Sequence, residues 1–205
     1  DSSLYYAQNG LRIAIEFLYL EWLADSRNRI GNAWEAVGNY EESKNAYLRA
    51  LSIDQQIGIP YGIGRDNHQI GVVLAKSANL EEALEFELKS IKILENSSSE
   101  RKDSLALGNI YNSTGGIFID LAEYREALKY FRKGLSLRES LKDTIGISKS
   151  YNEIALVYES VKLFQTALRY HNKSLHYSER ISYLPGQATS YQNIGNIYSS
   201  LGGLD

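Results

Sequence analysis

Residues 152–158 read Asn-Glu-Ile-Ala-Leu-Val-Tyr, and residues 192–198 repeat the pattern as Gln-Asn-Ile-Gly-Asn-Ile-Tyr. Three further copies stand at 28–34 (Asn-Arg-Ile-Gly-Asn-Ala-Trp), 68–74 (His-Gln-Ile-Gly-Val-Val-Leu) and 112–118 (Asn-Ser-Thr-Gly-Gly-Ile-Phe). The third residue of the five copies is at positions 30, 70, 114, 154 and 194, so the period is 40 residues with one four-residue insertion. A fixed period of this length indicates a repeat architecture in which each copy is one supersecondary unit.

A second recurring block follows each copy and carries small side chains at fixed positions. The first small position holds Ser43, Ala83, Ala127 and Ala167, and the second, seven residues later, holds Ala50, Ser90, Gly134 and Ser174. Spacings of three, four and seven residues place side chains on one face of a helix. Asn39 and Asn79 precede two of these blocks, where each is predicted to cap a helix N-terminus. Each unit is therefore predicted to be a helix A, a tight turn and a helix B that packs closely against helix A.

These repeats resemble the tetratricopeptide repeat family over the whole chain. The resemblance lies in the small and aromatic residues of helix A, in Gly38 before the turn, in the turn aromatics Tyr40, Tyr124 and Phe164, and in the small residue of helix B. It implies an all-α fold, a right-handed superhelical solenoid of tandem antiparallel helix pairs.

Two features depart from the family pattern. The period is longer than the commonest length of about 34 residues, and no proline ends helix B. Longer helices B, each followed by a turn at Gly62, Gly146 or Gly186, would account for both departures. This longer variant is similar to the repeats of kinesin light chains and of bacterial sensor kinases and regulators.

The repeat register predicts the organisation of the chain. We expect a helix B without its partner and a linker in 1–23, four helix pairs in 24–63, 64–107, 108–147 and 148–187, and a helix A without its partner in 188–205, ten helices in all. The insertion is placed in a Ser-rich surface loop over 96–103. Because neither end carries a polar capping repeat, the chain is expected to be a piece of a longer repeat protein.

Composition limits the functions that the chain can have. Lys and Arg number 22 against 25 acidic residues, so the clustered basic charge that nucleic-acid binding requires is not expected. The chain has no cysteine, which excludes thiolate metal ligands and cysteine nucleophiles. No apolar run reaches the roughly 20 residues of a membrane helix. No cofactor is expected.

Candidate binding residues lie on the helices A, which in such a solenoid line the concave groove. One position per repeat is mostly an amide, and an amide can both donate and accept a hydrogen bond to an extended peptide. Further polar and charged residues lie nearby on the same helices. The predicted groove residues are Asn28, Arg29, Asn32, Arg65, His68, Asn112, Lys149, Asn152, Glu153, Gln192 and Asn196. The alternative is that these residues only keep a helix face solvated.

Motifs for other functions are weak. The stretch Gly62-Ile-Gly-Arg-Asp-Asn67 begins like a dinucleotide fingerprint but lacks the last glycine and follows no strand. His171 and His176 lie five residues apart on one helix and are interpreted as packing or surface residues. The family's carboxylate clamp is poorly supported, because basic and acidic residues alternate in the groove.

The leading hypothesis is a non-catalytic scaffold that binds a protein or an extended peptide, as an interaction or signal-input module of a larger regulatory protein. A receptor for a small signalling ligand and an oligomerisation or spacer arm, self-associating through its end helices, remain as alternatives. The compartment is taken as cytoplasmic by default, with a periplasmic location open if the chain belongs to a sensor.

Overall fold

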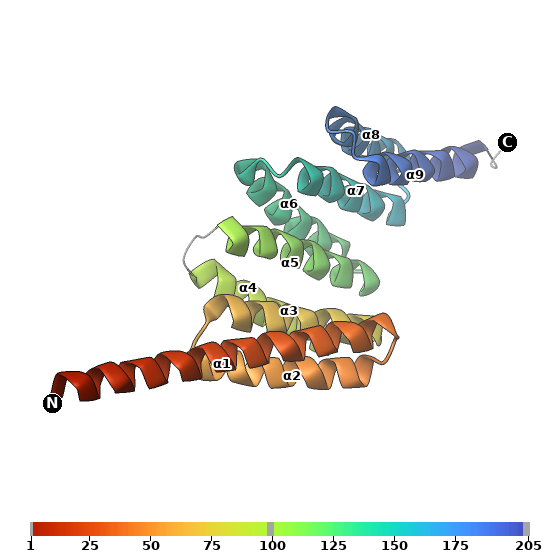
Figure 1. The fold of residues 1–205 in the computed structure, drawn as a ribbon. Helices are drawn as coiled ribbons and strands as arrows, with labels where there is room; N and C mark the ends of the chain where they lie inside the picture. The colour runs from red at the N-terminus through yellow and green to blue at the C-terminus, as the bar shows by residue number, and fades with distance from the viewer. Residues whose placement is uncertain (1, 98–100, 203–205) are drawn as a thin grey trace. The chain divides into compact units, whose positions relative to one another are not determined.

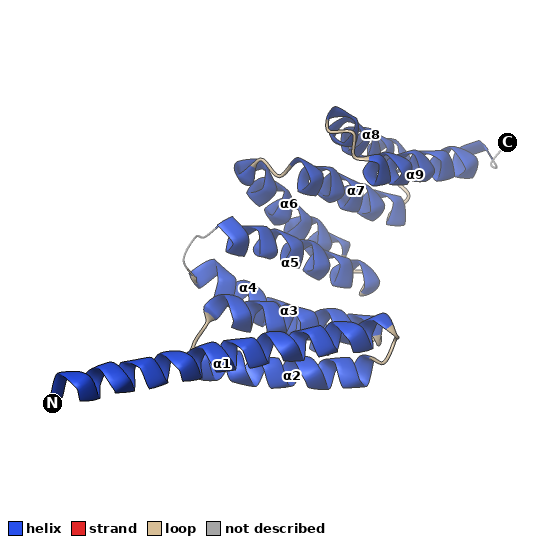
Figure 2. Ribbon diagram, in the orientation of Figure 1, coloured by secondary structure: helices blue, strands red, loops and turns tan. Residues whose placement is uncertain are grey.

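The computed structural model describes residues 2–97 and 101–202, and within this part every element of secondary structure is a helix (Figure 2). The chain divides into two compact units, residues 1–98 and 99–205. In each unit, consecutive helices run antiparallel and pack side by side (Figure 1). The prediction of an all-α solenoid of tandem helix pairs is confirmed.

The first unit contains α1 (Ser2–Ala36), α2 (Tyr40–Ile57), α3 (Pro60–Lys76) and α4 (Leu80–Asn96). The second contains α5 (Arg101–Asp120), α6 (Tyr124–Leu141), α7 (Thr144–Ser160), α8 (Phe164–Arg180) and α9 (Leu184–Gly202). Helices A are the second half of α1 together with α3, α5, α7 and α9, and helices B are the four helices between them. The predicted loop over 96–103 falls partly on residues 98–100, which lie outside the described residues.

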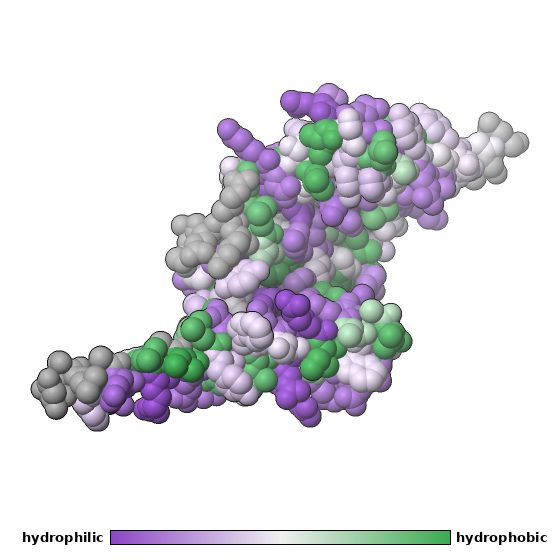
Figure 3. Space-filling view, viewed as in Figure 1, coloured by the Kyte–Doolittle hydropathy of each residue, from purple (hydrophilic) through white to green (hydrophobic). Residues whose placement is uncertain are grey.

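The N-terminal region differs from the prediction of a helix B, a linker and a helix A. It forms one continuous helix of 35 residues, so the described residues hold nine helices where ten were expected. No proline and no turn sequence interrupts the residues around position 23, and a helix without a breaker continues. The first half of α1 extends past α2, and Figure 3 shows apolar side chains along it. Its exposed large apolar residues are Tyr5, Tyr6, Leu11, Ile13, Ile15, Phe17, Leu18, Tyr19 and Trp22.

The helices A that follow begin earlier than predicted, at residues 60, 101, 144 and 184. Gly62, Gly146 and Gly186, interpreted as turn residues from the sequence, lie in the first turn of α3, α7 and α9. A Cβ at each glycine would overlap the side chain of Asp54, Arg138 or Ser178, respectively, near the end of the preceding helix B. These glycines therefore permit a close approach between helices, and the pair boundaries lie several residues before the predicted ones.

The core of each pair forms where the predicted small residues lie. Ser43, Ala83, Ala127 and Ala167 are completely buried. Large side chains of helix B fill notches that small residues leave in helix A: the ring of Tyr47 contacts Gly31, and the ring of Phe131 contacts Gly115. A Cβ at Gly31 would lie 2.4–2.8 Å from the ring atoms of Tyr47 if the helices kept their positions. The small residues thus set how closely the helices of one pair approach.

The predicted N-caps are correct in position but not equally effective. The side chain of Asn39 accepts a hydrogen bond from the backbone N–H of Glu42 at 3.3 Å. Asn79 is the residue before α4, but its side chain donates to Ser77 Oγ and makes no cap bond. Sequence alone identifies the cap position, and the rotamer decides whether the cap forms.

The turn between helix A and helix B requires a left-handed residue in every pair. Gly38, Ala78, Ala122 and Lys162 have φ values of 77°, 62°, 58° and 60°. Only glycine adopts this conformation without a steric cost. Three of the four turns therefore retain some backbone strain.

Replacing Ala122 by glycine should raise the free energy of unfolding by about 0.5–1 kcal/mol, because glycine relieves the left-handed strain at a helix C-terminus. Urea unfolding monitored by circular dichroism measures the change. Gly38→Ala is the matched reverse substitution, and it should lower stability by about 1 kcal/mol. Equal stability of Ala122→Gly and the wild type would contradict this account of the turn.

Candidate functional site

In the first unit, two of the predicted groove residues belong to a buried polar cluster between α1, α2 and α3. Asn28 is buried and donates from Nδ2 to Asp66 Oδ1 at 2.9 Å. Arg65 donates to Asp66 Oδ1 at 3.0 Å, to Asp25 Oδ1 at 2.9 Å and to Asp54 Oδ2 at 3.1 Å. Asn28 and Arg65 therefore join neighbouring helices and are not free to bind a peptide.

This cluster holds three carboxyl groups and one guanidinium. Burial raises the pKa of Asp66 to about 7, an effect that the positive charge of Arg65 opposes and the negative charge of Asp54 reinforces. Asp66 Oδ2 and Asn28 Oδ1 are both buried and without a hydrogen-bond partner in the described part of the chain. A proton on Asp66 removes one of the buried negative charges.

The other predicted residues of the first unit make contacts within or between helix pairs. His68 Nδ1 lies 3.0 Å from both carboxylate oxygens of Glu87, which projects from α4. Asn32 Oδ1 accepts hydrogen bonds from Tyr47 Oη at 2.7 Å and from Gln69 Nε2 at 3.3 Å. Arg29 is exposed, beside a surface cleft of α1 that it lines with Trp22, Asp25 and Ser26.

In the second unit, Asn152 connects three helices. Its Oδ1 lies 3.0 Å from Nδ1 of the buried His171 on α8 and accepts from Asn193 Nδ2 on α9 at 2.9 Å. His171 Nε2 lies 2.5 Å from Glu159 Oε1. Burial lowers the pKa of His171, and the hydrogen bond and negative charge of Glu159 oppose that shift. The interpretation of His171 as a packing residue agrees with its burial, whereas His176 is exposed.

Replacing Asn152 by alanine should lower the free energy of unfolding by about 1–3 kcal/mol, because it leaves polar atoms of His171 and Asn193 unpaired in a partly buried place. Chemical denaturation followed by circular dichroism measures this loss. Gln192→Ala, at an exposed position of α9, is the control and should stay within about 0.5 kcal/mol of the wild type. If Asn152→Ala left the free energy of unfolding unchanged, Asn152 would have no structural role.

The remaining predicted residues fall into two groups. Asn112 is half-buried, and Ser150 Oγ lies 3.5 Å from its Oδ1. Gln192 and Asn196 are exposed on α9. Of the predicted amides, Asn28, Asn112 and Asn152 thus contact neighbouring helices. Gln192 and Asn196 on α9 are exposed to solvent.

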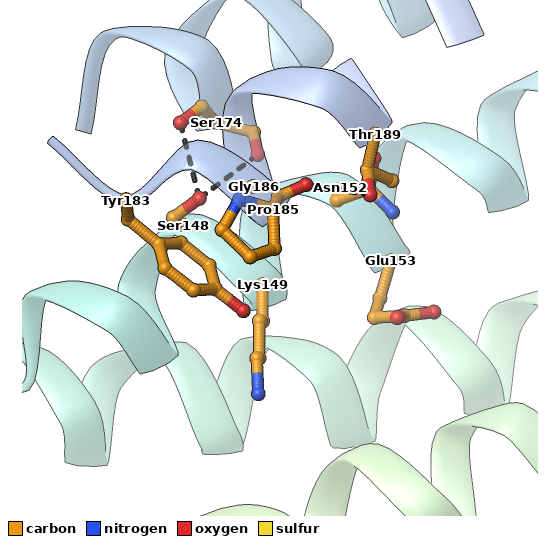
Figure 4. Close-up of a pocket in the computed structure, with 9 residues that line it drawn as sticks. All are labelled: Ser148, Lys149, Asn152, Glu153, Ser174, Tyr183, Pro185, Gly186 and Thr189. Atoms are coloured by element: carbon orange, nitrogen blue, oxygen red, sulfur yellow. Dashed lines mark hydrogen bonds between the residues drawn. The ribbon is translucent and has the colours of Figure 1, made fainter. Parts of the chain in front are cut away.

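Three of the predicted residues come together in one pocket of about 230 Å³ between α7, α8 and α9 (Figure 4). Lys149, Asn152 and Glu153 of α7 form one wall. The rest of the lining comprises Ser148, Ser174, Tyr183, Pro185, Gly186 and Thr189. Ser148 Oγ lies 3.1 Å from Ser174 Oγ and 2.6 Å from Ser178 Oγ, so buried hydroxyl groups form the deep end.

The pocket has an acidic side chain, Glu153, at its edge. Burial raises the pKa of Glu153, and the charges of Arg138 and Lys149 oppose this shift. Within the described residues, no side chain donates a hydrogen bond to the Glu153 carboxylate. Figure 4 shows the side chains of Lys149 and Glu153 diverging from each other, with the lysine extending away from Ser148 and Ser174. A bound hydrogen-bond donor could therefore pair with Glu153.

Sequence reasoning did not identify the α8 and α9 side of this pocket. Tyr183, Pro185 and Thr189 precede or begin a helix whose start was predicted at residue 188. The signal that could have revealed the pocket is Ser178, a small residue at the position where the preceding pair has Arg138.

The described residues contain no group of three His, Asp or Glu side chains that could hold a metal ion. None of the described helices has the length and apolar character to span a membrane.

Comparisons with known proteins agree with the repeat register. The family model of the tetratricopeptide repeat matches residues 24–57 and 108–141, which correspond to two of the helix pairs. No curated protein matches the chain by sequence. Among solved structures, BtubC (BKLC) from P. vanneervenii has a TM-score of 0.77 at 18% identity, over 98% of this chain and 82% of that protein.

Two further solved structures are similar over most of the chain. A signal-transduction ATPase with a tetratricopeptide repeat sensor from Pyrococcus horikoshii has a TM-score of 0.72 at 17% identity, over 90% of this chain and 30% of that protein. Aspartyl phosphate phosphatase F from Bacillus subtilis has a TM-score of 0.80 at 16% identity, over 100% of this chain and 52% of that protein. At such identities the likeness concerns the fold, one that commonly serves as a protein-interaction scaffold. The helix pairs formed by residues 24–57 and 108–141 thus match the tetratricopeptide repeat, and the whole chain has the fold of tandem repeats of this kind.

Proposed function

We propose that this chain is a non-catalytic scaffold that binds an extended peptide along the helix A face of its second unit, as an interaction or signal-input module of a larger regulatory protein. The observation that carries the proposal is the pocket that Lys149, Asn152 and Glu153 form with the start of α9. Peptide recognition needs a cleft with a few fixed polar groups, and this pocket has them.

The distribution of polar groups favours the second unit over the first. In the first unit, Asn28 and Arg65 already have partners in neighbouring helices. On the second unit, Gln192 and Asn196 are exposed on α9. Their amide groups are available to a peptide backbone that leaves the pocket along α9.

A small polar ligand is a second candidate, because residues of α7, α8 and α9 together line the pocket and several of them are polar. The two candidates differ in extent: a small ligand needs the pocket alone, whereas a peptide also needs the exposed amides of α9. Loss of binding in a Gln192→Ala, Asn196→Ala double variant would therefore support the peptide.

A peptide-array screen tests the proposed function. The wild-type chain is compared with a charge-exchanged variant, Lys149→Glu with Glu153→Lys, which keeps the composition and net charge. The matched control exchanges Glu126 and Lys129, an ion pair at 2.8 Å on α6. We expect the wild type and the control to bind the same peptides and the pocket variant to lose them, with circular dichroism unchanged. Equal binding by all three proteins would refute a site at this pocket.

A further inference from the structure

The pocket can be interpreted by comparing one position across the helix pairs. Asp54, Arg138 and Ser178 each face the glycine in the first turn of the next helix A, namely Gly62, Gly146 and Gly186. These three residues therefore occupy the same place in the interfaces between α1 and α3, between α5 and α7, and between α7 and α9. We call this place the junction position.

The junction residue is charged in two of these interfaces, as Asp54 and as Arg138. In both of them a guanidinium group fills the space beside the junction position. Between α5 and α7, Arg138 is itself the junction residue and donates to Ser150 Oγ at 2.6 Å and to Asn109 Oδ1 at 2.7 Å. Between α1 and α3, the junction residue Asp54 instead accepts a hydrogen bond from Arg65, which projects from α3.

The interface between α7 and α9 has no such group of its own. Its junction residue Ser178 is small, completely buried and hydrogen-bonded to Ser148. The position equivalent to Arg65 is Thr189, which is too short to reach across and lies in the pocket wall. The space that a guanidinium takes in the other interfaces therefore remains open here as the pocket.

The lining of this pocket suits a guanidinium from outside the chain. Glu153 supplies a half-buried carboxylate without a hydrogen bond from the described residues, and a guanidinium can donate two parallel hydrogen bonds to a carboxylate. The Tyr183 ring lines the pocket, and guanidinium groups stack on aromatic faces. The Lys149 side chain extends away from Ser148 and Ser174, which form the deep end of the pocket (Figure 4). The deep end is therefore uncharged.

We propose that the pocket between α7, α8 and α9 binds an arginine side chain of the partner peptide, with Glu153 as its acceptor and Tyr183 as its stacking surface. The inference rests on the proposed function, because it names the side chain that a bound peptide places there. It commits to arginine over lysine, because the equivalent spaces between α1 and α3 and between α5 and α7 hold guanidinium groups.

Nuclear magnetic resonance titration of the whole chain tests the inference with three probes, the blocked pentapeptides Gly-Gly-Xaa-Gly-Gly with arginine, lysine or citrulline in the centre. Citrulline has nearly the same shape as arginine but no charge. We expect the arginine peptide to shift the amide signals of residues 148–153 and 183–189, with an affinity about tenfold or more above that of the citrulline peptide, since charge-assisted bidentate bonds are strong. Equal affinities of the arginine peptide and either other peptide would overturn the proposal.

Two variants complete the test. Glu153→Gln should reduce the affinity for the arginine peptide to that for the citrulline peptide, and Ser178→Arg should abolish binding by placing the chain's own guanidinium in the pocket. Gln165→Ala, at an exposed position of α8, is the control and should bind as the wild type does. Because Ser178→Arg changes a buried residue, Glu153→Gln is the decisive variant, and unchanged affinity in that variant contradicts the proposal.

A failure of the arginine site can be distinguished from a failure of the proposed peptide-binding function. If the array yields peptides that bind equally well with and without arginine, the scaffold function stands and the arginine site is wrong. If the arginine probe binds at the pocket but the array yields nothing, the arginine site stands and the extended-peptide function is wrong.

Discussion

Raising the pH from about 5.5 to about 8.5 should destabilise the first unit by about 2 kcal/mol, through the ionisation of Asp66. The pKa of this buried carboxyl is raised from 3.8 to about 7 in the folded chain. In the unfolded chain Asp66 loses its proton at much lower pH, so across this interval the unfolded state binds fewer protons than the folded state. Stability therefore falls as the pH rises towards the folded pKa, and it levels off above that pKa.

The groups around Asp66 explain why its proton is retained. Arg65 is the one cation of the cluster, and it also contacts Asp25 and Asp54. Asp54 is buried, and its pKa is raised first by burial and further by Asp25 and Glu21 on α1. One guanidinium cannot neutralise two buried carboxylates and an exposed one, so a proton on Asp66 lowers the electrostatic cost.

Urea unfolding at several pH values, with hydrogen exchange to locate the change in residues 2–97, measures this effect. Asp66→Asn, which mimics the protonated carboxyl, should be more stable than the wild type at pH 8.5, and the first unit should lose most of its fall in stability between pH 5.5 and 8.5. Asp25→Asn is the control at the exposed edge of the cluster, and it should retain the pH dependence. A wild-type pH dependence that persists in Asp66→Asn would assign the effect to another group.

Replacing Phe131 by alanine should lower the free energy of unfolding by about 3–5 kcal/mol, the usual cost of removing a buried aromatic side chain. Phe131 is 0% exposed, and its ring fills the notch at Gly115 between α5 and α6. Because Gly115 has no side chain that could fill the space, the two helices cannot close the cavity without moving as whole bodies.

Chemical denaturation measures the loss, and hydrogen exchange should locate it in residues 101–202. Tyr198→Ala is the control, since Tyr198 occupies a helix A position of α9 and is 61% exposed. That variant should stay within about 0.5 kcal/mol of the wild type. A cost below about 1 kcal/mol for Phe131→Ala would contradict the assignment of this notch as the centre of the α5–α6 core.

The repeat architecture could be predicted from the sequence, because the same packing requirement recurs about every 40 residues. The small residues at positions 43, 83, 127 and 167 mark that requirement. The first residue of each helix A could not be predicted in this way. A glycine such as Gly62 fits both a turn and a close helix contact, and only the position of Asp54 distinguishes the two. The continuous α1 was missed because the period predicts which residues are equivalent and not whether the chain turns between them.

The candidate site was predicted only in part for a similar reason. Periodicity placed Asn28, His68 and Asn152 on the correct helices, but it could not show that each forms hydrogen bonds with a neighbouring helix. Lys149 and Glu153 were identified because they are charged. The pocket itself depends on Ser178, a small residue on a helix B, whose significance appears only beside Arg138 in three dimensions.

Hydrogen–deuterium exchange with and without a peptide selected on the array would show whether the second unit carries the binding surface. We expect slower exchange of backbone amides in the first half of α7 and in α9, covering residues 144–153 and 184–196, with no change in α1. Protection confined to the exposed apolar part of α1, residues 5–22, would refute binding at the pocket and place the functional surface there.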